Sequence, residues 1–341
     1  EEWVVHAFGR KMFECYFKCY TEKVWGIDCS RISADWASQR IGGLSLRVAL
    51  LNALGLKRNN TPKTLIESFC YPRHGIGEIS LRMAERIEAK NQILRRARVR
   101  KLLHDGTRIT ALLWEGEDGE LRRHEGTHYL SSIPITEVVR GFDPPAPPEI
   151  LAAAQRLKFR SLVLVALFFD VPQVTESSWI YFPDPQIGFG RIHEPNNWSR
   201  DLIPEGRSCL VFEYFCTEGD EVWSLDDAAL VERTLGDLSR LDFHPRLSER
   251  VLDRCVVRLR HAYPIYEIGF KVPLGRIMRY VRTFSNLTLM GRYGTYKYIN
   301  MDHSIEMGMK AAENLLGRRH DILGVDRDSA YLEGPPLDSA A

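Results

Sequence analysis

A short stretch near the end of the chain places chemically useful groups at the expected entrance of a helix. In "LMGRYGTYKYINMDHSIEMGMKAAENLLG", residues 289–317, an apolar strand runs into Gly291 and Arg292 and then into an Asn-Met-Asp step at 300–302. The first turn of a helix has free N–H groups and about half a positive charge, so it suits an anion or a carbonyl that becomes an oxyanion. Gly291 permits close backbone approach. Arg292 offers five donors to a phosphate or a polar ring edge.

The helix after this entrance is predicted from apolar residues at helical spacing. The stripe expected to be buried consists of Met301, Ile305, Met309, Ala312 and Leu316. Asp302 is expected as the N-cap and Gly317 as the glycine that follows the helix. Gly308 would allow something flat to pack closely on the helix. These residues alone also fit a plain strand–turn–helix connection whose tyrosines fill a corner of a domain.

The rest of the chain predicts a mixed α/β or α+β fold with strands in the middle and helices at both ends. Period-two patterns between 92 and 134 predict strands joined by a His-Asp-Gly hairpin, and Gly26 marks a tight turn within an expected loop at 20–33. Helices are expected at 1–20, 33–55, 71–91, 148–157 and 224–241, and further strands at 160–170, 178–182, 208–216 and 253–260.

Bulk composition excludes several classes of protein. The chain has 341 residues and a net charge of +1, so no global field draws it to nucleic acid or anionic membrane. No apolar run is long enough for a transmembrane helix. The seven cysteines do not form a disulfide pattern or a recognisable metal site, even though Cys15 and Cys19 share a helix face. Free thiols favour a reducing cytoplasm.

Six separated pieces change the interpretation of the opening stretch. In chain order they are "YTEKVWG" (20–26), "YPRHGIGEI" (71–79), "LKFRSL" (157–162), "GFGRIHEPNNW" (188–198), "FEYF" (212–215) and "GRYGTYKYINMD" (291–302). Together they resemble the UDP-galactopyranose mutases and the wider group of flavoproteins with amine oxidases and protoporphyrinogen oxidases. The resemblance implies an FAD/NAD(P)-binding Rossmann-like fold, with an inserted substrate domain that contains an antiparallel sheet.

The resemblance also implies which residues bind FAD. Gly291 and Arg292 would be the C-terminal flavin-binding element, and the amides near Asn300, Met301 and Asp302 would face the pyrimidine edge of the flavin. A helix N-terminus at that edge stabilises the negative charge of the reduced flavin. The strand that contains Val99, and the "SSIP" turn at 131–134, would flank the adenine.

One part of the family pattern is missing. The chain has no Gly-x-Gly-x-x-Gly turn between a strand and a helix, which would cradle the FAD pyrophosphate. We therefore expect the first βαβ unit to be absent and the sequence to be truncated at its N-terminus. The expected organisation is a helical cap region (1–70), part of the FAD-binding domain (71–143), a substrate-binding sheet domain (144–262), the C-terminal FAD element (263–320) and a tail (321–341).

The substrate residues are implied by the same resemblance. Arg160 and Tyr298 match positions that hold a diphosphate in the mutases, and Phe189 and Arg191 match a substrate-binding step. The second diphosphate arginine could be Arg258 or Arg260. A surface position for Arg160 is an equally good interpretation, as is core packing for the tryptophans near these residues.

Two departures favour oxidoreductase chemistry over mutase chemistry. The mutases have Tyr-Asp-Met where this chain has Ile299-Asn300-Met301, and they have a tyrosine where this chain has Phe189. We therefore expect an FAD-dependent oxidoreductase that acts on a small molecule. A nucleotide sugar is one candidate for that substrate. The alternatives are a mutase-like flavoenzyme and a flavin-free binding protein similar to Rab-escort proteins and GDP-dissociation inhibitors.

Overall fold

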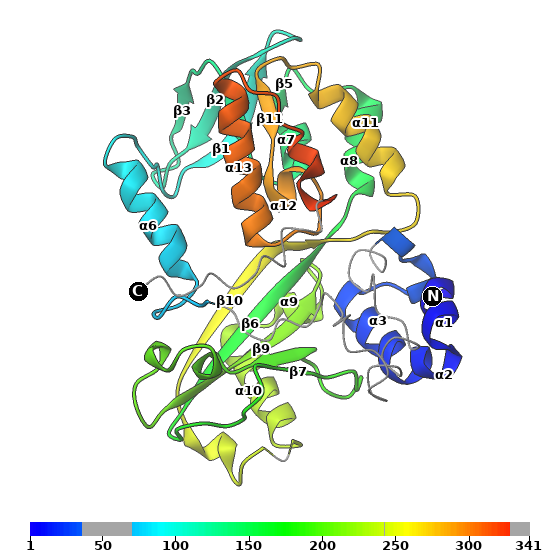
Figure 1. The fold of residues 1–341 in the computed structure, drawn as a ribbon, viewed down its shortest axis with the longest axis vertical. Coiled ribbons are helices and arrows are strands. Elements are labelled where there is room, and N and C mark those ends of the chain that lie inside the picture. The colour runs from blue at the N-terminus through cyan, green and yellow to red at the C-terminus, as the bar shows by residue number, and fades with distance from the viewer. Residues whose placement is uncertain (36–69, 242, 328–341) are drawn as a thin grey trace, which may run out of the picture. The chain divides into compact units, whose positions relative to one another are not determined.

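The computed structural model describes residues 1–35, 70–241 and 243–327. These residues form two compact units, shown as ribbons in Figure 1. The first unit comprises Glu1–Ile93 and Phe159–Ile268, and the second comprises Leu94–Lys158 and Gly269–Ala341. The helix expected at 33–55 lies outside the described residues beyond residue 35.

The first unit is built on a five-stranded antiparallel sheet in the order β10-β6-β9-β8-β7. Its strands are β6 (Phe159–Phe169), β7 (Trp179–Tyr181), β8 (Arg191–His193), β9 (Ser208–Cys216) and β10 (Val251–Pro264). The long apolar run in β6 pairs on both sides, with β9 and with β10. A central strand is buried on both faces, which explains its nearly continuous apolar sequence.

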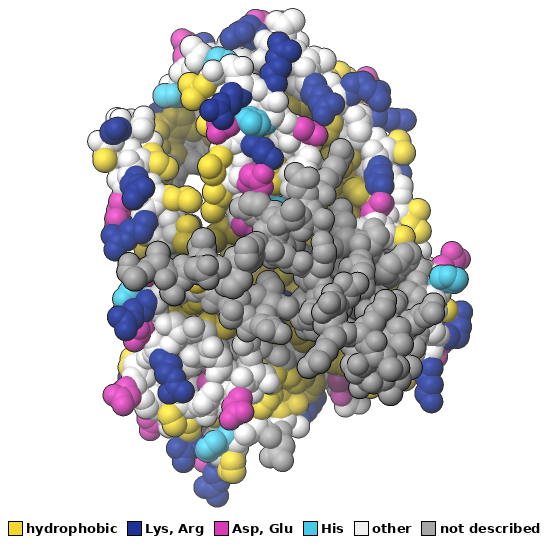
Figure 2. Space-filling view, in the orientation of Figure 1, with side chains coloured by type: hydrophobic (Ala, Val, Ile, Leu, Met, Phe, Trp, Pro, Cys, Tyr) yellow, Lys and Arg dark blue, Asp and Glu magenta, His cyan; other side chains and the backbone are white. Residues whose placement is uncertain are grey.

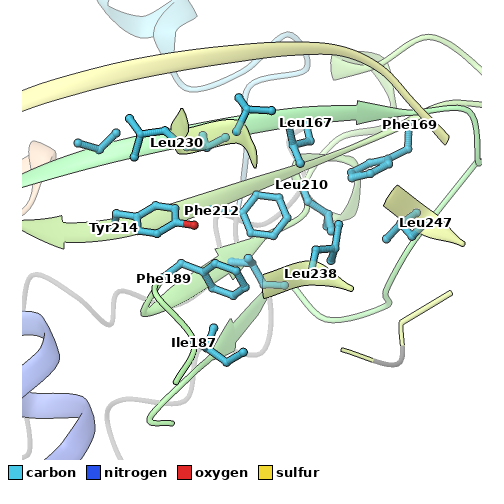
Figure 3. Close-up of a cluster of buried hydrophobic side chains, with 14 of the residues drawn as sticks. Leu167, Phe169, Ile187, Phe189, Leu210, Phe212, Tyr214, Leu230, Leu238 and Leu247 are labelled. Carbon is cyan, nitrogen blue, oxygen red and sulfur yellow. The ribbon is translucent and has the colours of Figure 1, made fainter. Parts of the chain in front are cut away.

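One face of this sheet carries the main core of the first unit. The helix α10 (Asp227–Leu238) packs on it through Leu230, Val231 and Leu238, and Figure 3 shows the buried side chains between helix and strands. Asp226 caps α10 by accepting a hydrogen bond from the Ala229 amide at 2.8 Å. Because side chains alternate between the two faces of a strand, every second residue of β9 points away from α10, toward the opposite face of the sheet.

The N-terminal helical segment is more divided than the sequence predicts. It consists of α1 (Glu2–Phe8), α2 (Arg10–Met12), a π-helical turn (Phe13–Lys18) and α3 (Cys19–Trp25). The break after α1 occurs at Gly9, whose φ of 85° is not helical. The loop expected at 20–33 is wrong in its first part, because α3 continues to Trp25. Gly26 is left-handed and ends the helix as expected.

Among the described residues, the other helices of the first unit are short, apart from α6. α6 (Gly77–Glu88) follows the Pro/Gly turn as predicted, but it has no buried residue. α9 (Glu221–Ser224) precedes α10, and 3₁₀ turns occur at Cys29–Arg31, Pro195–Asn197, Arg200–Leu202 and Leu247–Arg250.

The second unit contains two small sheets. One has the order β3-β2-β1-β5, formed by β1 (Arg98–His104), β2 (Ile109–Glu115), β3 (Leu121–His124) and β5 (Phe142–Asp143). The other pairs β4 (Tyr129–Ser131) with β11 (Leu287–Leu289) in parallel. The predicted hairpin between β1 and β2 is confirmed.

Six helices accompany these sheets among the described residues of the second unit. They are α7 (Ile135–Gly141), α8 (Pro148–Arg156), α11 (Lys271–Val281), α12 (Gly291–Gly294), α13 (Met301–Leu315) and a 3₁₀ helix at Ile322–Arg327. α8 and α11 lie side by side (Figure 1). Because α8 belongs to this unit, the division follows Lys158 and not residue 143, and the segment up to Ile93 belongs with the first unit.

The buried face of α13 differs from the predicted one. His303, Met307 and Ala311 are buried, whereas Met301 and Met309 are exposed. The expected stripe is therefore wrong. Both sets of residues repeat at helical spacing, so the periodicity could not decide between them. Met307 packs with Ile299 and Val325, so part of the expected tail is folded against α13.

No helix among the described residues has the length and apolar character to cross a membrane. Figure 2 shows positive and negative side chains interspersed over the visible face, in keeping with the small net charge.

Candidate functional site

The entrance of α13 is built on a close contact between two turns. The amide of Met290 donates to the Ser131 carbonyl at 2.9 Å, at the end of the β4–β11 pair. A Cβ atom on Gly294 would lie 2.8 Å from the same carbonyl oxygen, so only glycine fits without a shift. Gly291 has a φ of 70°, which favours glycine. The structure thus brings together the "SSIP" turn and the Gly-Arg element, two pieces that the sequence had assigned to one flavin site.

Arg292 shapes the turn that leads into α13. Its Nη1 donates to the Ile299 carbonyl at 2.9 Å, and its guanidinium carbon lies 4.4 Å from the centre of the Tyr298 ring. This stacked geometry is typical of an arginine cation on an aromatic face. Arg292 and Tyr298, which the sequence had assigned to cofactor and substrate respectively, are therefore direct neighbours in the second unit.

Asn300 occupies the N-cap of α13, the position expected for Asp302. Its side chain makes no capping hydrogen bond, although its carbonyl accepts from the Ser304 amide at 3.2 Å. Asp302 lies within the first helical turn. Because the Asn300 side chain does not cap α13, an acceptor group on a ligand could bond to the amides of its first turn. This arrangement fits the polar edge of a flavin ring.

Val99 is half-buried in β1, where it pairs with Trp114. Among the described residues, no hydrogen bond or ring contact connects it to the segment 291–302. Its role beside an adenine therefore stays a prediction.

A second polar cluster lies in the first unit, on the sheet face opposite α10. Arg191 in β8 donates to Glu213 in β9 through Nε at 2.9 Å and Nη2 at 2.6 Å. Nδ1 of His193 lies 3.1 Å from the same carboxylate. Burial opposes ionisation of Glu213, but the hydrogen bonds from His193 and Arg191 outweigh it and lower the pKa of this carboxyl. Glu213 is therefore an ionised acceptor whose negative charge compensates the positive charge of Arg191.

Aromatic side chains surround this cluster. Tyr181 of β7 lies below the Arg191 guanidinium at 5.9 Å and meets Tyr20 of α3 edge to face at 5.3 Å. The His193 ring is stacked on Trp198 at 5.1 Å. Burial raises the pKa of the Tyr20 hydroxyl, so this group stays protonated at neutral pH.

Arg160 does not belong to this cluster. The residue is 8% exposed. Its guanidinium donates to the carbonyl oxygens of Val24 at 2.9 Å, Lys23 at 3.2 Å and Phe215 at 3.0 Å, and to Thr217 Oγ1 at 2.7 Å. These bonds satisfy the carbonyls at the end of α3 and hold that helix against β9. These contacts support a structural role for Arg160, and the diphosphate contact stays a prediction.

Lys23 has a similar structural task. Its Nζ donates to the carbonyls of Phe182 at 2.8 Å, Asp184 at 2.6 Å and Ile187 at 2.8 Å, and so closes the loop between β7 and β8. Burial lowers its pKa. Arg160 also explains Gly26, where a Cβ atom would lie 2.6 Å from the guanidinium carbon. The "YTEKVWG" segment thus holds the sheet and its loops in place.

The packing of Phe189 does not support its predicted contact with a substrate. Its side chain is fully buried and packs between Phe212 and Tyr214 on the α10 face (Figure 3). It has no surface for a substrate. Arg258 is paired with Asp227 and Arg260 with Glu218, so both arginines are engaged at the α9–α10 side of the unit.

Sequence reasoning did not bring Glu213 and His193 together. Their meeting depends on the register of β8 and β9, which places Arg191 opposite Glu213. The available signal was the period of two in the strands, which puts Arg191 and His193 on one face.

Comparisons with known proteins agree with this arrangement. The family model for flavin-containing amine oxidoreductases matches residues 21–316. The fold is similar to that of a reduced UDP-galactopyranose mutase, with a TM-score of 0.79 and 19% sequence identity, covering 97% of this chain and 69% of the mutase. It is also similar to cyclohexylamine oxidase from Brevibacterium oxydans IH-35A, with a TM-score of 0.62 and 12% identity, covering 93% of this chain and 67% of the oxidase.

A third similar structure is a protein from Exiguobacterium sp. 255-15, provisionally assigned as a protoporphyrinogen oxidase. Its TM-score is 0.57 at 16% identity, and the match covers 90% of this chain and 66% of that protein. The chain thus spans about two thirds of the length of these proteins. At such low identity the structures show a shared fold, and the family model, which covers most of the chain, shows the family. The chain belongs to the flavin-containing amine oxidoreductases.

Proposed function

We propose that this chain is an FAD-dependent oxidoreductase in which the second unit binds the flavin and the sheet of the first unit binds a small substrate. The observation that carries the proposal is the uncapped N-terminus of α13 behind Gly291 and Arg292, within a chain that belongs to a flavin family. When bound, FAD supplies two-electron redox chemistry. The residues of the chain hold and orient it.

Each residue near this entrance has a definite part in the proposal. Arg292 keeps the turn at Tyr298 and Ile299 in place, so that the N-terminus of α13 points at the ligand. The amides of Met301 and Asp302 would bind the acceptor atoms at the pyrimidine edge of the flavin. Asn300 adds no negative charge there, which favours a reduced, anionic flavin.

The first unit supports an oxidoreductase more than a mutase. Of the arginines that the mutase pattern assigns to the substrate, Arg160 is used by carbonyl oxygens and Arg191 by Glu213. A dianionic ligand there would meet little uncompensated positive charge. We therefore do not propose mutase chemistry for this chain.

The test is a visible absorption spectrum of the purified chain after incubation with FAD and removal of the excess. A flavin band near one equivalent is expected, and Arg292→Ala should lower the retained flavin. Arg279→Ala, an exposed change on α11 in the same unit, should retain the flavin of the unmodified chain. A chain that stays colourless would contradict the proposal. Unchanged flavin content in Arg292→Ala would remove that residue from the site.

Redox chemistry is tested next by adding candidate amines and other small reductants without oxygen. Bleaching of the flavin band is the expected result. Turnover of UDP-galactopyranose without net reduction would instead select the mutase chemistry that the arginines disfavour.

A further inference from the structure

One nitrogen of the His193 imidazole, Nδ1, forms a hydrogen bond with Glu213, and the other, Nε2, does not. Glu213 is ionised and can only accept, so Nδ1 carries the proton of the 3.1 Å hydrogen bond. Nε2 of a neutral ring is then an acceptor. Among the described residues, Nε2 has no hydrogen-bond partner, and it is not among the buried polar atoms. The structure thus presents a fixed, solvent-accessible acceptor in the first unit.

Exposed aromatic rings lie beside this acceptor. Trp179 and Tyr181 on the edge strand β7 are 45% and 52% exposed, which is unusual for rings of this size. Trp179 lies opposite His193 in the strand register, and its ring is 4.8 Å from that of Trp198, on which His193 stacks. Rings grouped around one polar group are typical of surfaces that bind a flat ligand.

The charges of Arg191 and Glu213 cancel on this face. Arg191 is paired with Glu213 through two hydrogen bonds. The ammonium group of Lys23 donates its hydrogen bonds to carbonyl oxygens of the β7–β8 loop. The nearby surface therefore offers an anion little electrostatic advantage. Arg191 still has N–H groups at Nη1 that could donate to a carbonyl beside the ring of the ligand.

We propose that this face of the β7–β8–β9 sheet binds a neutral, flat ring compound, and that an N–H or O–H group of the ligand donates to Nε2 of His193. Glu213 is a positioning residue that fixes the tautomer of His193. The inference deepens the proposed function, since it names the class of substrate for the first unit. Its binding chemistry can be measured without flavin.

A matched pair of probes tests the donor. Indole has a ring N–H, and 1-methylindole has a similar ring without it. With the full chain, ligand-observed NMR should show that indole binds about three- to tenfold more tightly, the range expected for one hydrogen bond. In a chain labelled with ¹⁵N-histidine, indole should shift the Nε2 resonance of His193 and 1-methylindole should not. UDP should not displace indole.

Two variants separate the acceptor from general packing. His193→Phe keeps a flat ring on Trp198 but removes both nitrogens, so the two probes should bind alike. His124→Phe, an exposed change in the second unit, should keep the difference between the probes. Equal binding of the probes to the unmodified chain would overturn the proposal, as would a difference that survives in His193→Phe or displacement of indole by UDP.

The flavin spectrum of the same samples distinguishes the two ideas. Discrimination between the probes by a chain that does not retain FAD would overturn the proposed cofactor and support the ring site. A yellow chain without discrimination would support the cofactor and overturn the ring site.

Discussion

On the sheet of the first unit, charged side chains pair with one another. At the entrance of α13 in the second unit, the charge offered to a ligand is the partial positive charge of the backbone at the helix N-terminus. Arg191 and Glu213 form a bidentate pair that His193 joins, and the residues around it are mostly aromatic. At α13 the N-cap side chain makes no capping hydrogen bond to the helix, and the turn before it is rich in glycine. The first arrangement fixes side chains in place, and the second leaves donors for a ligand.

This difference predicts that substitutions in the first region act mainly on stability, and those in the second mainly on ligand binding. A large loss of stability on replacing the N-cap side chain of α13, or none on replacing Glu213, would contradict this expectation. The predictions below run from the largest expected effect to the smallest.

Glu213→Ala should have the largest effect. It leaves Arg191 and His193 without their shared partner in a site where their side chains are 24% and 16% exposed. Removing one member of a buried ion pair costs about 3–5 kcal/mol. Urea unfolding followed by circular dichroism measures this loss. The control is Glu205→Ala in an exposed loop, which should change the free energy of unfolding by less than about 0.5 kcal/mol.

The same pair predicts a pH dependence with a definite sign. The pKa of Glu213 is lowered in the folded chain, so its contribution to stability is complete above the unfolded pKa of about 4.3 and is lost as the pH falls toward the lower folded value. The groups that face it are Arg191, His193 and Tyr20. The stability advantage of the unmodified chain over Glu213→Gln should therefore shrink below about pH 4. A difference that stays constant from pH 7 to pH 3 would contradict the pairing.

Arg160→Met should cost about 2–4 kcal/mol in the free energy of unfolding. It keeps the apolar stem but removes the donors to three carbonyls and a hydroxyl that lie in a buried region. The change acts through the anchoring of α3, so the affinity for indole per folded molecule should stay within about twofold. Strongly reduced affinity at unchanged stability would show that Arg160 contacts the ligand after all.

Two glycines of the second unit form a matched pair. Gly294→Ala puts a methyl group 2.8 Å from the Ser131 carbonyl and should cost about 1–3 kcal/mol. At Gly308, which lies inside α13, an added Cβ atom would meet nothing within 4 Å. Because alanine favours a helix over glycine, Gly308→Ala should stabilise the unit by about 0.5–1 kcal/mol. Thermal unfolding of both variants measures the contrast. If Gly308→Ala nevertheless weakens FAD binding, the flat surface expected at Gly308 is used by the cofactor.

The sequence allowed much of the framework to be predicted, because most elements have a clear local pattern. The apolar run of β6, the hairpin of β1 and β2, and the ending of α13 before Gly317 all follow from neighbouring residues. The buried stripe of α13 does not, since two stripes have the same spacing and only the packing partners decide between them.

The chemistry of the arginines was even less accessible from sequence. Arg160 and Arg191 were both assigned to a substrate, yet one binds backbone carbonyls and the other a carboxylate 22 residues away. An arginine in a strand does not reveal which partner it meets, because that depends on strand register and on helices from elsewhere in the chain. Phe189 precedes β8, and its burial against Phe212 and Tyr214 depends on packing partners that the local sequence does not reveal.

Asn300→Asp should have the smallest effect on stability and the most specific effect on the cofactor. A carboxylate at the N-cap can accept from the first-turn amides of α13, so the free energy of unfolding should rise by about 0.3–1 kcal/mol. The same negative charge would face a reduced flavin, so the reduction potential of bound FAD should fall, as measured by dye-coupled spectroscopy. Glu306→Gln, on the next turns of α13, is a control that should leave the potential near its original value. A stabilised helix with an unchanged potential would mean that the flavin does not lie at this N-terminus, and the contrast between a matched sheet face and a ligand-directed helix entrance would then fail at its second half.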